Sequence, residues 1–260
     1  MDVVRRAVPI ETRAPGGRTN AYVVGRDPAI LVDPPARTEE LDELVQRRGV
    51  EHVLVTHTHP DHVGGVEAYV TDPDRTAWSL ADHGARFASA TGIDPDDVVD
   101  DGDRIELGGG AVRVVSVPGH APDHVALVVE GGGPILCGDC AVRDGSVVVG
   151  GDGADMRAYL DSLARLRDLE PPTMLPGHGP PIERPDATLE RLIDHRLQRE
   201  RRIRNAVHEG ERTPTEVVAA SYDKALTGVE GLARATVVAH LEKLDADGEL
   251  SFDGERAVPE

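Results

Sequence analysis

The stretch Thr56-His57-Thr58-His59-Pro60-Asp61-His62 decides how the rest of the chain is interpreted. It places three imidazoles and one carboxylate within six residues, directly after the apolar run 52–55, which predicts a buried strand. Helix-type sequence resumes after Gly64-Gly65, so we expect the four groups to share one loop between a strand and a helix. Imidazole and carboxylate are ligands that zinc, iron and manganese prefer. The stretch therefore predicts a metal site rather than a histidine-rich surface turn.

The composition bounds the class of protein. A chain of 260 residues with 39% hydrophobic content can bury a sizeable core, in one large domain or in one domain with a small extension. The net charge of −19 predicts a hydrated acidic surface, such as that of a halophile-like protein in a salt-rich cytoplasm. The same charge argues against non-specific binding to nucleic acid, and we do not expect duplex DNA as a partner.

The N-terminal residues and the cysteines indicate which cellular compartment to expect. Residues 1–6 lack the apolar core of a signal peptide, and no window reaches the length of a transmembrane span. The only cysteines, Cys137 and Cys140, exclude a disulfide scaffold. We therefore expect a cytoplasmic protein with two reduced thiols and no membrane partner.

Short apolar runs alternate with helical patterns up to about residue 180. This alternation predicts an α/β layered domain with sheets inside and helices outside. Strands are expected at 3–10, 20–24, 29–32, 52–55, 75–78, 104–107, 111–117, 125–129, 134–137 and 173–175, and helices at 38–48, 65–70, 80–90 and 155–169.

The composition changes after Pro181. Long helices are predicted over 188–209 and 231–246, a capping box at Thr213-Pro214-Thr215-Glu216, and a hairpin over 250–258. We therefore predict two domains, a catalytic one over 1–183 and a small helical, winged-helix-like one over 184–260. Residues 186–260 contain 11 basic and 16 acidic residues, a net charge of −5, which argues against a DNA-reading role. We expect this domain to shape the active-site groove or to form a homodimer.

Three further segments carry candidate ligands, each just after a predicted strand. They are His120, Asp139 and His178, and each follows a glycine that lets the backbone turn tightly. Strand ends are where layered α/β folds place their sites. Because these residues are far apart in the sequence, they can act with the 57–62 motif only if the fold brings their loops together.

The order H-x-H-x-D-H at 57–62, then His120, Asp139 and His178, resembles the ligand set of metallo-β-lactamase-fold hydrolases. The resemblance covers the first 180 residues and implies an αββα sandwich of two mixed sheets. It also implies two divalent metal ions, zinc in the first place, with iron or manganese as alternatives. Carried over by position, His57, His59 and His120 would hold the first ion, Asp61, His62 and His178 the second, and Asp139 would bridge both.

Segments 118–127, 137–140, 195–200 and 240–244 resemble more narrowly the β-lactamase-like protein 2 group, which adds a winged-helix-like C-terminal domain. Some members of that group are single-strand endoribonucleases, and others are known only as hydrolases or as glyoxalase-II-like. Asp139 stands where β-lactamases of this fold use cysteine. Only 38 residues separate Asp139 from His178, which leaves no room for the inserted cap domain of the nucleic-acid-processing branch.

These features predict a metal-dependent hydrolase, in which a hydroxide bridged by two divalent metals attacks an ester-like bond. Asp61 is the candidate catalytic residue, because it could orient the hydroxide or carry its proton. A thioester or small ester, as in glyoxalase II, is the favoured substrate, and single-stranded RNA is the alternative. A redox or sulfur-handling activity on this fold remains an alternative. A non-enzymatic winged-helix nucleic-acid binder is disfavoured by the acidic tail.

Other residues near these motifs have two interpretations each. Asp33 ends a predicted strand and either hydrogen-bonds a ligand imidazole or forms a turn. His124, four residues after His120, either lines the substrate pocket or is structural, which we favour. Both thiols are expected to pack in the core. The arginines between 199 and 204 are expected on a solvated helix face.

Overall fold

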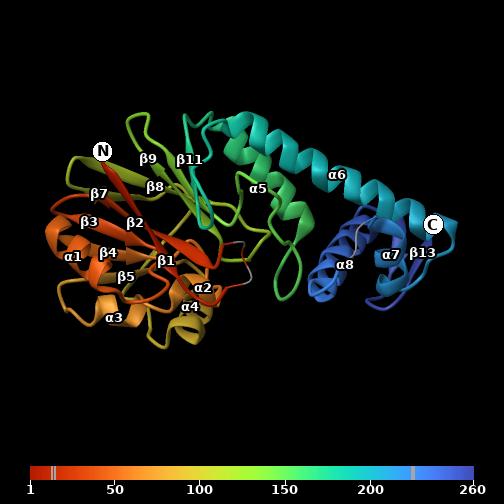
Figure 1. Cartoon of the computed structure of the whole chain (residues 1–260), viewed down its shortest axis with the longest axis horizontal. Helices are drawn as coiled ribbons and strands as arrows, with labels where there is room; N and C mark the ends of the chain where they lie inside the picture. The colour runs from red at the N-terminus through yellow and green to blue at the C-terminus, as the bar shows by residue number, and fades with distance from the viewer. Residues whose placement is uncertain (13, 15, 224–225) are drawn as a thin grey trace.

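The computed structural model describes residues 1–12, 14, 16–223 and 226–260. Its N-terminal part contains two β-sheets with helices around them, and its C-terminal part contains helices and a short hairpin (Figure 1). The first sheet has strand order β1-β2-β3-β4-β5-β6, with antiparallel pairing up to β3 and parallel pairing beyond it. These strands are β1 (Val3–Pro9), β2 (Arg18–Gly25), β3 (Ala29–Val32), β4 (Val50–Leu54), β5 (Thr76–Leu80) and β6 (Asp97–Val99).

The second sheet has strand order β11-β10-β9-β8-β7. Only the β10–β11 pair is parallel, so both sheets are mixed, as the resemblance implies. Its strands are β7 (Arg104–Leu107), β8 (Gly110–Ser116), β9 (Val125–Val129), β10 (Ile135–Gly138) and β11 (Met174–Pro176).

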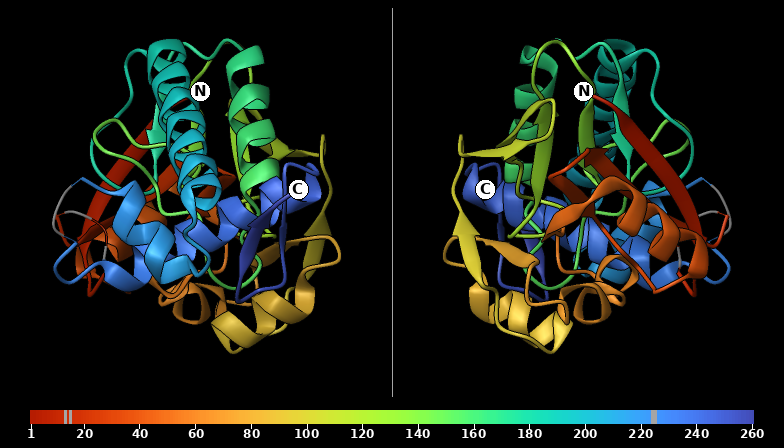
Figure 2. Two further views of the ribbon diagram at one scale, coloured as in Figure 1. Left: turned by 90° about the vertical axis from the view of Figure 1, so that its right-hand side faces the viewer. Right: turned by 90° about the vertical axis from the view of Figure 1, so that its left-hand side faces the viewer.

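The apolar side chains fall into layers. One buried cluster joins the facing sides of the two sheets, with Ile30 and Leu54 from the first and Val114 and Leu127 from the second. Helices α1 (Glu39–Arg48), α3 (Val66–Val70) and α4 (Gly84–Thr91) cover the outer side of the first sheet. Helices α5 (Met156–Asp168) and α6 (Pro185–Glu209) cover the second sheet and lie side by side (Figures 1 and 2). This is the expected α/β arrangement of two sheets between helices.

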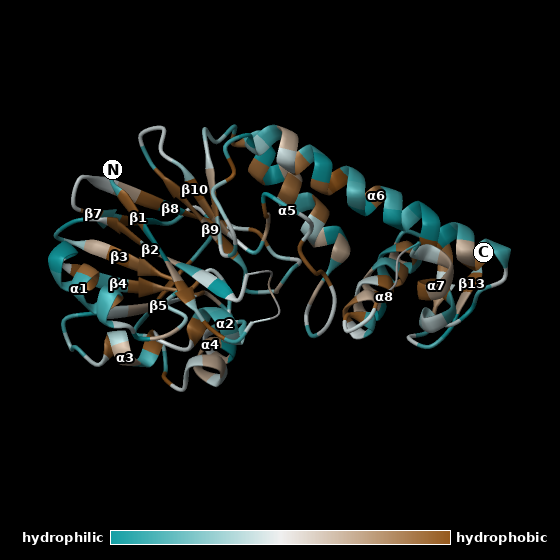
Figure 3. Cartoon of the chain, in the orientation of Figure 1, coloured by the Kyte–Doolittle hydropathy of each residue, from teal (hydrophilic) through white to brown (hydrophobic). Residues whose placement is uncertain are grey.

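The C-terminal part consists of α6, α7 (Pro214–Ser221), α8 (Glu230–Ala246), β12 (Leu250–Phe252) and β13 (Ala257–Pro259). The predicted capping box is present, since the Thr213 and Glu216 side chains each accept from the other residue's backbone N–H. Leu189 and Leu192 of α6 join the core beside the second sheet, whereas Ile203 and Val207 join a separate C-terminal cluster. Figure 3 shows hydrophobic strands inside and a largely hydrophilic outer face on α6. The division at residues 183 and 184 stays a prediction.

Two local features differ from the sequence-based expectation. Helix α2 (Pro60–Val63) begins inside the metal motif, so Asp61 and His62 are helical instead of sharing a loop. Pro60 explains this, because its fixed φ suits the first position of a helix. Strand β6 was not predicted, because its three residues are too few to show an alternating pattern. Within the described residues, none of the helices combines the length and the apolar composition needed to cross a bilayer.

Candidate metal centre

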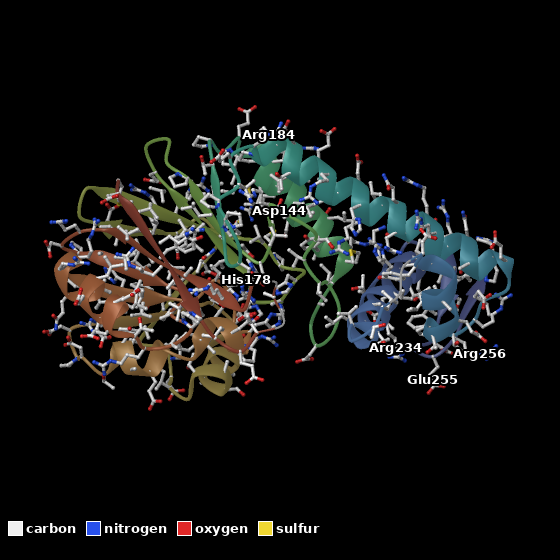
Figure 4. The ribbon with its side chains drawn as sticks, viewed as in Figure 1. Asp144, His178, Arg184, Arg234, Glu255 and Arg256 are labelled. Atoms are coloured by element: carbon white, nitrogen blue, oxygen red, sulfur yellow. The ribbon has the colours of Figure 1, made fainter. Side chains whose placement is uncertain are left out.

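Strand ends from both sheets meet at one place in the fold. The 56–62 motif follows β4, and His120, Asp139 and His178 follow β8, β10 and β11. Figure 4 labels His178 on the side of the sheets that faces the C-terminal helices. The structure brings together all seven residues expected as ligands. They form three overlapping groups, and within each group the nitrogen and oxygen atoms lie within 4.8 Å of one another.

The first group consists of His57, His59 and His120. His59 Nδ1 lies 3.0 Å from His57 Nε2 and 2.9 Å from His120 Nε2. Burial lowers the pKa of His57 well below its usual value and that of His59 to about 4, and it also lowers the pKa of His120. Three neutral imidazoles therefore direct lone pairs at one point, which is the donor set that a divalent cation needs.

The second group consists of Asp61, His62 and His178. His178 Nε2 lies 3.3 Å from Asp61 Oδ2. Burial would lower the pKa of His178, but its hydrogen bonds to Asp139 and Asp61 raise it to about 10. Burial would raise the pKa values of Asp61 and Asp139, but the hydrogen bonds from His178 and the charge of His62 lower them. A cation bound here would replace the protons on these imidazoles.

Asp139 lies between the two groups. Its Oδ2 is 3.8 Å from His120 Nε2 of the first group and 3.3 Å from His178 Nε2 of the second. Its Oδ1 is 3.7 Å from His62 Nε2. A Cβ at residue 177 would come within 2.5 Å of Asp139 Oδ1, so Gly177 leaves the space that this carboxylate occupies. The two groups thus form a candidate dinuclear metal site around one carboxylate.

Asp33 is the buried acid behind both groups. Its Oδ1 accepts from the Thr56 backbone N–H at 2.6 Å, and its Oδ2 accepts from the Thr56 hydroxyl at 2.8 Å. Asp33 Oδ2 also lies 3.0 Å from His62 Nδ1. The Thr56 oxygen is 3.1 Å from His57 Nδ1 and can accept its proton. Asp33 therefore orients His57 through Thr56, and its charge lies beside the His62 ring on the side away from Nε2.

His124 is fully buried behind the site. Its ring stacks on His57 with centroids 4.8 Å apart, and its Nε2 accepts from the Asp139 backbone N–H at 3.0 Å. Burial lowers its pKa well below the usual value, so the ring is neutral. This placement matches the structural interpretation. Both cysteine thiols lie in the apolar core, outside the metal-type groups found among the described residues.

Some supporting contacts had no signal in the sequence analysis. The Thr12 hydroxyl donates to Asp61 Oδ2 at 2.6 Å, although the two residues are 49 positions apart. His178 Nδ1 lies 2.8 Å from the backbone oxygen of Arg18. Thr56, in contrast, stands directly before His57 in the motif, so its position in the sequence was a signal for a contact with that ligand.

Comparison with known proteins places this arrangement in a family. The family model for the Metallo-beta-lactamase superfamily matches residues 14–178. The chain belongs to the metallo-β-lactamase superfamily. Its α/β fold and its His/Asp cluster are those of a superfamily hydrolase with a candidate metal site.

Similarity to other proteins extends beyond residues 14–178. A Beta-lactamase-like protein 2 homolog from Drosophila melanogaster is 31% identical over 258 residues, which cover 89% of this chain and 84% of that protein. An Atrochrysone carboxyl ACP thioesterase from Emericella nidulans is 27% identical over 251 residues, covering 92% and 78%.

Solved structures agree on the fold. A metallo-beta-lactamase family protein from Thermus thermophilus superposes with a TM-score of 0.80 at 23% identity, over 99% of this chain and 98% of that one. The protein TTHA1623, solved in a di-iron-bound form, is 31% identical with a TM-score of 0.52, over 72% of this chain and 96% of that one. The first superposition includes the C-terminal helices.

Proposed function

We propose that this member of the metallo-β-lactamase superfamily hydrolyses thioesters or small esters with two divalent metal ions. The observation that carries the proposal is the placement of Asp139 between a three-histidine group and an Asp-His-His group. His57, His59 and His120 would hold one ion, Asp61, His62 and His178 the other, and Asp139 would contact both. Neutral imidazoles and carboxylates of this kind suit zinc, which we propose as the metal, and also iron or manganese.

The chemistry that two such ions supply is the lowering of the pKa of water towards neutrality and the polarisation of an ester carbonyl. The protein's own contribution includes proton transfer. Asp61 Oδ2 accepts from Thr12 at 2.6 Å and lies 3.3 Å from His178 Nε2, so its carboxylate is oriented on two sides. Its lowered pKa keeps it ionised but makes it a weak base, so it would take a proton only from a water whose own pKa bound ions have lowered. We therefore assign Asp61 the orientation and deprotonation of the attacking water.

Two observations favour a thioester over RNA. Three arginines of α6 that could otherwise contact an RNA backbone have partners within the C-terminal part. Arg202 pairs with Asp223 and Arg204 with Glu249, each at 2.5 Å, and the Arg199 guanidinium lies 3.6 Å from the centre of the Tyr222 ring. The relative that carries a thioesterase name supports the same substrate class.

The decisive experiment compares metal-loaded protein on three substrates: acyl thioesters, aryl esters and end-labelled single-stranded RNA. Asp61→Asn should lower turnover of the true substrate by about 10² to 10⁴-fold, the usual contribution of a positioned base. Asp82→Asn is the control, because Asp82 is exposed and belongs to none of the three metal-type groups. Thioester turnover that survives Asp61→Asn would contradict the mechanism. Cleavage of RNA alone, lost in Asp61→Asn, would reverse the substrate assignment.

The proposal also covers the architecture and the role of the C-terminal part. Helices α6, α7 and α8 with the β12–β13 hairpin have the order of elements of a winged helix. We propose that this winged-helix-like part shapes the substrate groove or forms a homodimer, and that it does not read duplex DNA. Light scattering after gel filtration gives the oligomeric state, and elemental analysis of the purified protein gives the metal.

A further inference from the structure

The loop between β10 and α5 connects the two halves of the candidate metal centre. It begins directly after β10 with Asp139, which lies near both groups, and it continues to a contact with His120. The Val148 backbone oxygen lies 2.7 Å from His120 Nδ1. A carbonyl can only accept, so His120 must carry its proton on Nδ1 and keep the Nε2 lone pair free. That Nε2 is the atom that faces His59. The position of Val148 therefore fixes the direction in which His120 Nε2 points.

Helix α6 holds this loop through two arginines. The Arg196 guanidinium donates to the backbone oxygen of Val147, next to the carbonyl that His120 uses. Arg191 donates to the oxygens of Gly145, Arg143 and Val142, at 2.6, 3.1 and 3.2 Å. Figure 4 labels Asp144 in this loop, close to α6. Most backbone carbonyls between Val142 and Val147 therefore accept hydrogen bonds from arginines of α6.

Arg196 differs from Arg191 in its environment, because only 3% of its surface is exposed. A buried guanidinium is unfavourable unless hydrogen bonds compensate for its desolvation. It lies 5.6 Å from the centre of the Tyr159 ring, and the Tyr159 hydroxyl donates to the Cys140 backbone oxygen at 2.9 Å. Arg196 therefore reaches the loop directly at Val147, next to the carbonyl that His120 uses, whereas Cys140 beside Asp139 is held by the Tyr159 hydroxyl.

Helix α8 closes the loop from the other side. A Cβ on Gly150 would lie 2.4 Å from the backbone carbon of Ala235 in α8, so the helix and the loop are in direct contact at this glycine. The segment that carries Val148 is held between α6 and α8. The arginine hydrogen bonds on one side and the close contact with Ala235 on the other limit the movement of this segment relative to His120.

We propose that Arg196 is a positioning residue for His120, so that the C-terminal helices form part of the metal centre. The guanidinium fixes the Val147–Val148 peptide, and the Val148 carbonyl fixes the His120 ring. The inference rests on the proposed metal site, but it does not depend on which ester is cleaved. Its consequence is selective: loss of Arg196 weakens the ion held by the three histidines and spares the other.

The test measures the affinity of the full-length protein for each of two Co²⁺ ions, by absorbance and by competition with a chelating dye. Arg196→Met should weaken one ion by about 10 to 100-fold, as loss of a supporting contact does in other metal sites. Arg196→Lys, which keeps the charge, should recover part of that affinity. Gly150→Ala should weaken the same ion by displacing the loop from α8. Arg202→Met is the control, since Arg202 pairs with Asp223 on the surface and should leave both affinities unchanged.

Urea unfolding of the metal-free variants separates positioning from general stability. A folded Arg196→Met protein that binds both ions with wild-type affinity would overturn the inference, even if its unfolding free energy falls. Equal weakening of both ions would do the same. If Arg196→Met does not fold, Gly150→Ala decides the question by the same criterion. Wild-type protein that binds fewer than two ions would instead contradict the proposed function.

Discussion

Replacement of Asp33 by asparagine tests whether a buried carboxylate maintains the metal centre. Asp33 is 1% exposed and has a left-handed backbone with φ of 51°. Asparagine tolerates this conformation nearly as well as aspartate, so the substitution removes the charge and one acceptor without backbone strain. The oxygens of Asp33 receive both Thr56 donors and face His62 Nδ1 at 3.0 Å.

The magnitude follows from those three contacts. Asparagine offers one oxygen, so its NH₂ group must face at least one of the donors that Asp33 now accepts. A hydrogen bond to a charged group contributes about 1.5–3 kcal/mol, and a buried donor left without a partner costs about 1–3 kcal/mol. We expect the free energy of unfolding to fall by about 2–4 kcal/mol in the metal-free protein. We also expect the ion held by His62 to bind about 10 to 100-fold more weakly.

Urea unfolding followed by circular dichroism measures the first quantity, and dye-competition titration measures the second. Asp82→Asn is a matched control, because Asp82 also has a positive φ of 64° but is exposed. It should change neither quantity. If Asp33→Asn unfolds at the same urea concentration as Asp82→Asn and binds both ions normally, the carboxylate does not support the site.

Three further predictions address the rest of the molecule. Removal of metal with a chelator should lower the melting temperature by about 5–10 °C, since an ion at 100 times its Kd stabilises by about 2.7 kcal/mol, and zinc should restore it. Leu163→Ala should lower the free energy of unfolding by about 2–5 kcal/mol, because Leu163 is fully buried beside the second sheet. Burial would raise the pKa of Glu200, but hydrogen bonds from His240 and Lys243 lower it. Its contribution is therefore present above the unfolded pKa and lost as pH falls through the folded value. Glu200→Gln should destabilise by about 1–3 kcal/mol at pH 7, and the difference from wild type should shrink below about pH 4.

Each of these three predictions can be contradicted by a specific result. A melting temperature that is insensitive to chelator would mean that the ions do not bind the folded state preferentially. An unchanged unfolding midpoint in Leu163→Ala would mean that this side chain is not packed as the structure shows. A Glu200→Gln effect that is equal at about pH 7 and about pH 3 would show that ionisation of Glu200 contributes nothing. Urea titrations at both pH values make that comparison.

Local sequence was sufficient to predict a helix end wherever the contacts that stabilise it come from neighbouring residues. Helix α1 is framed by Thr38, which caps its first turn, and by Gly49, whose left-handed φ of 60° ends it. The Thr213–Glu216 capping box is similarly local and was predicted correctly. The start of α2 was missed because the histidine pattern dominated the interpretation of a segment in which Pro60 begins a helix. Strand β6 was missed because it is defined by its pairing with β5, a distant segment.

The sequence by itself determined the chemistry of the candidate site. Three histidines and an aspartate in a fixed order, followed by His120, Asp139 and His178 after strands, specify ligand types, because only certain side chains can donate to a metal. The tertiary structure decided how these residues are held. His120 reaches a carbonyl 28 positions away, and Arg196 reaches the neighbouring carbonyl across 49 positions. A backbone carbonyl is the same in every residue, so these contacts leave no mark on the sequence of the loop. They exist only because the packing of α5, α6 and α8 places that loop beside the metal centre.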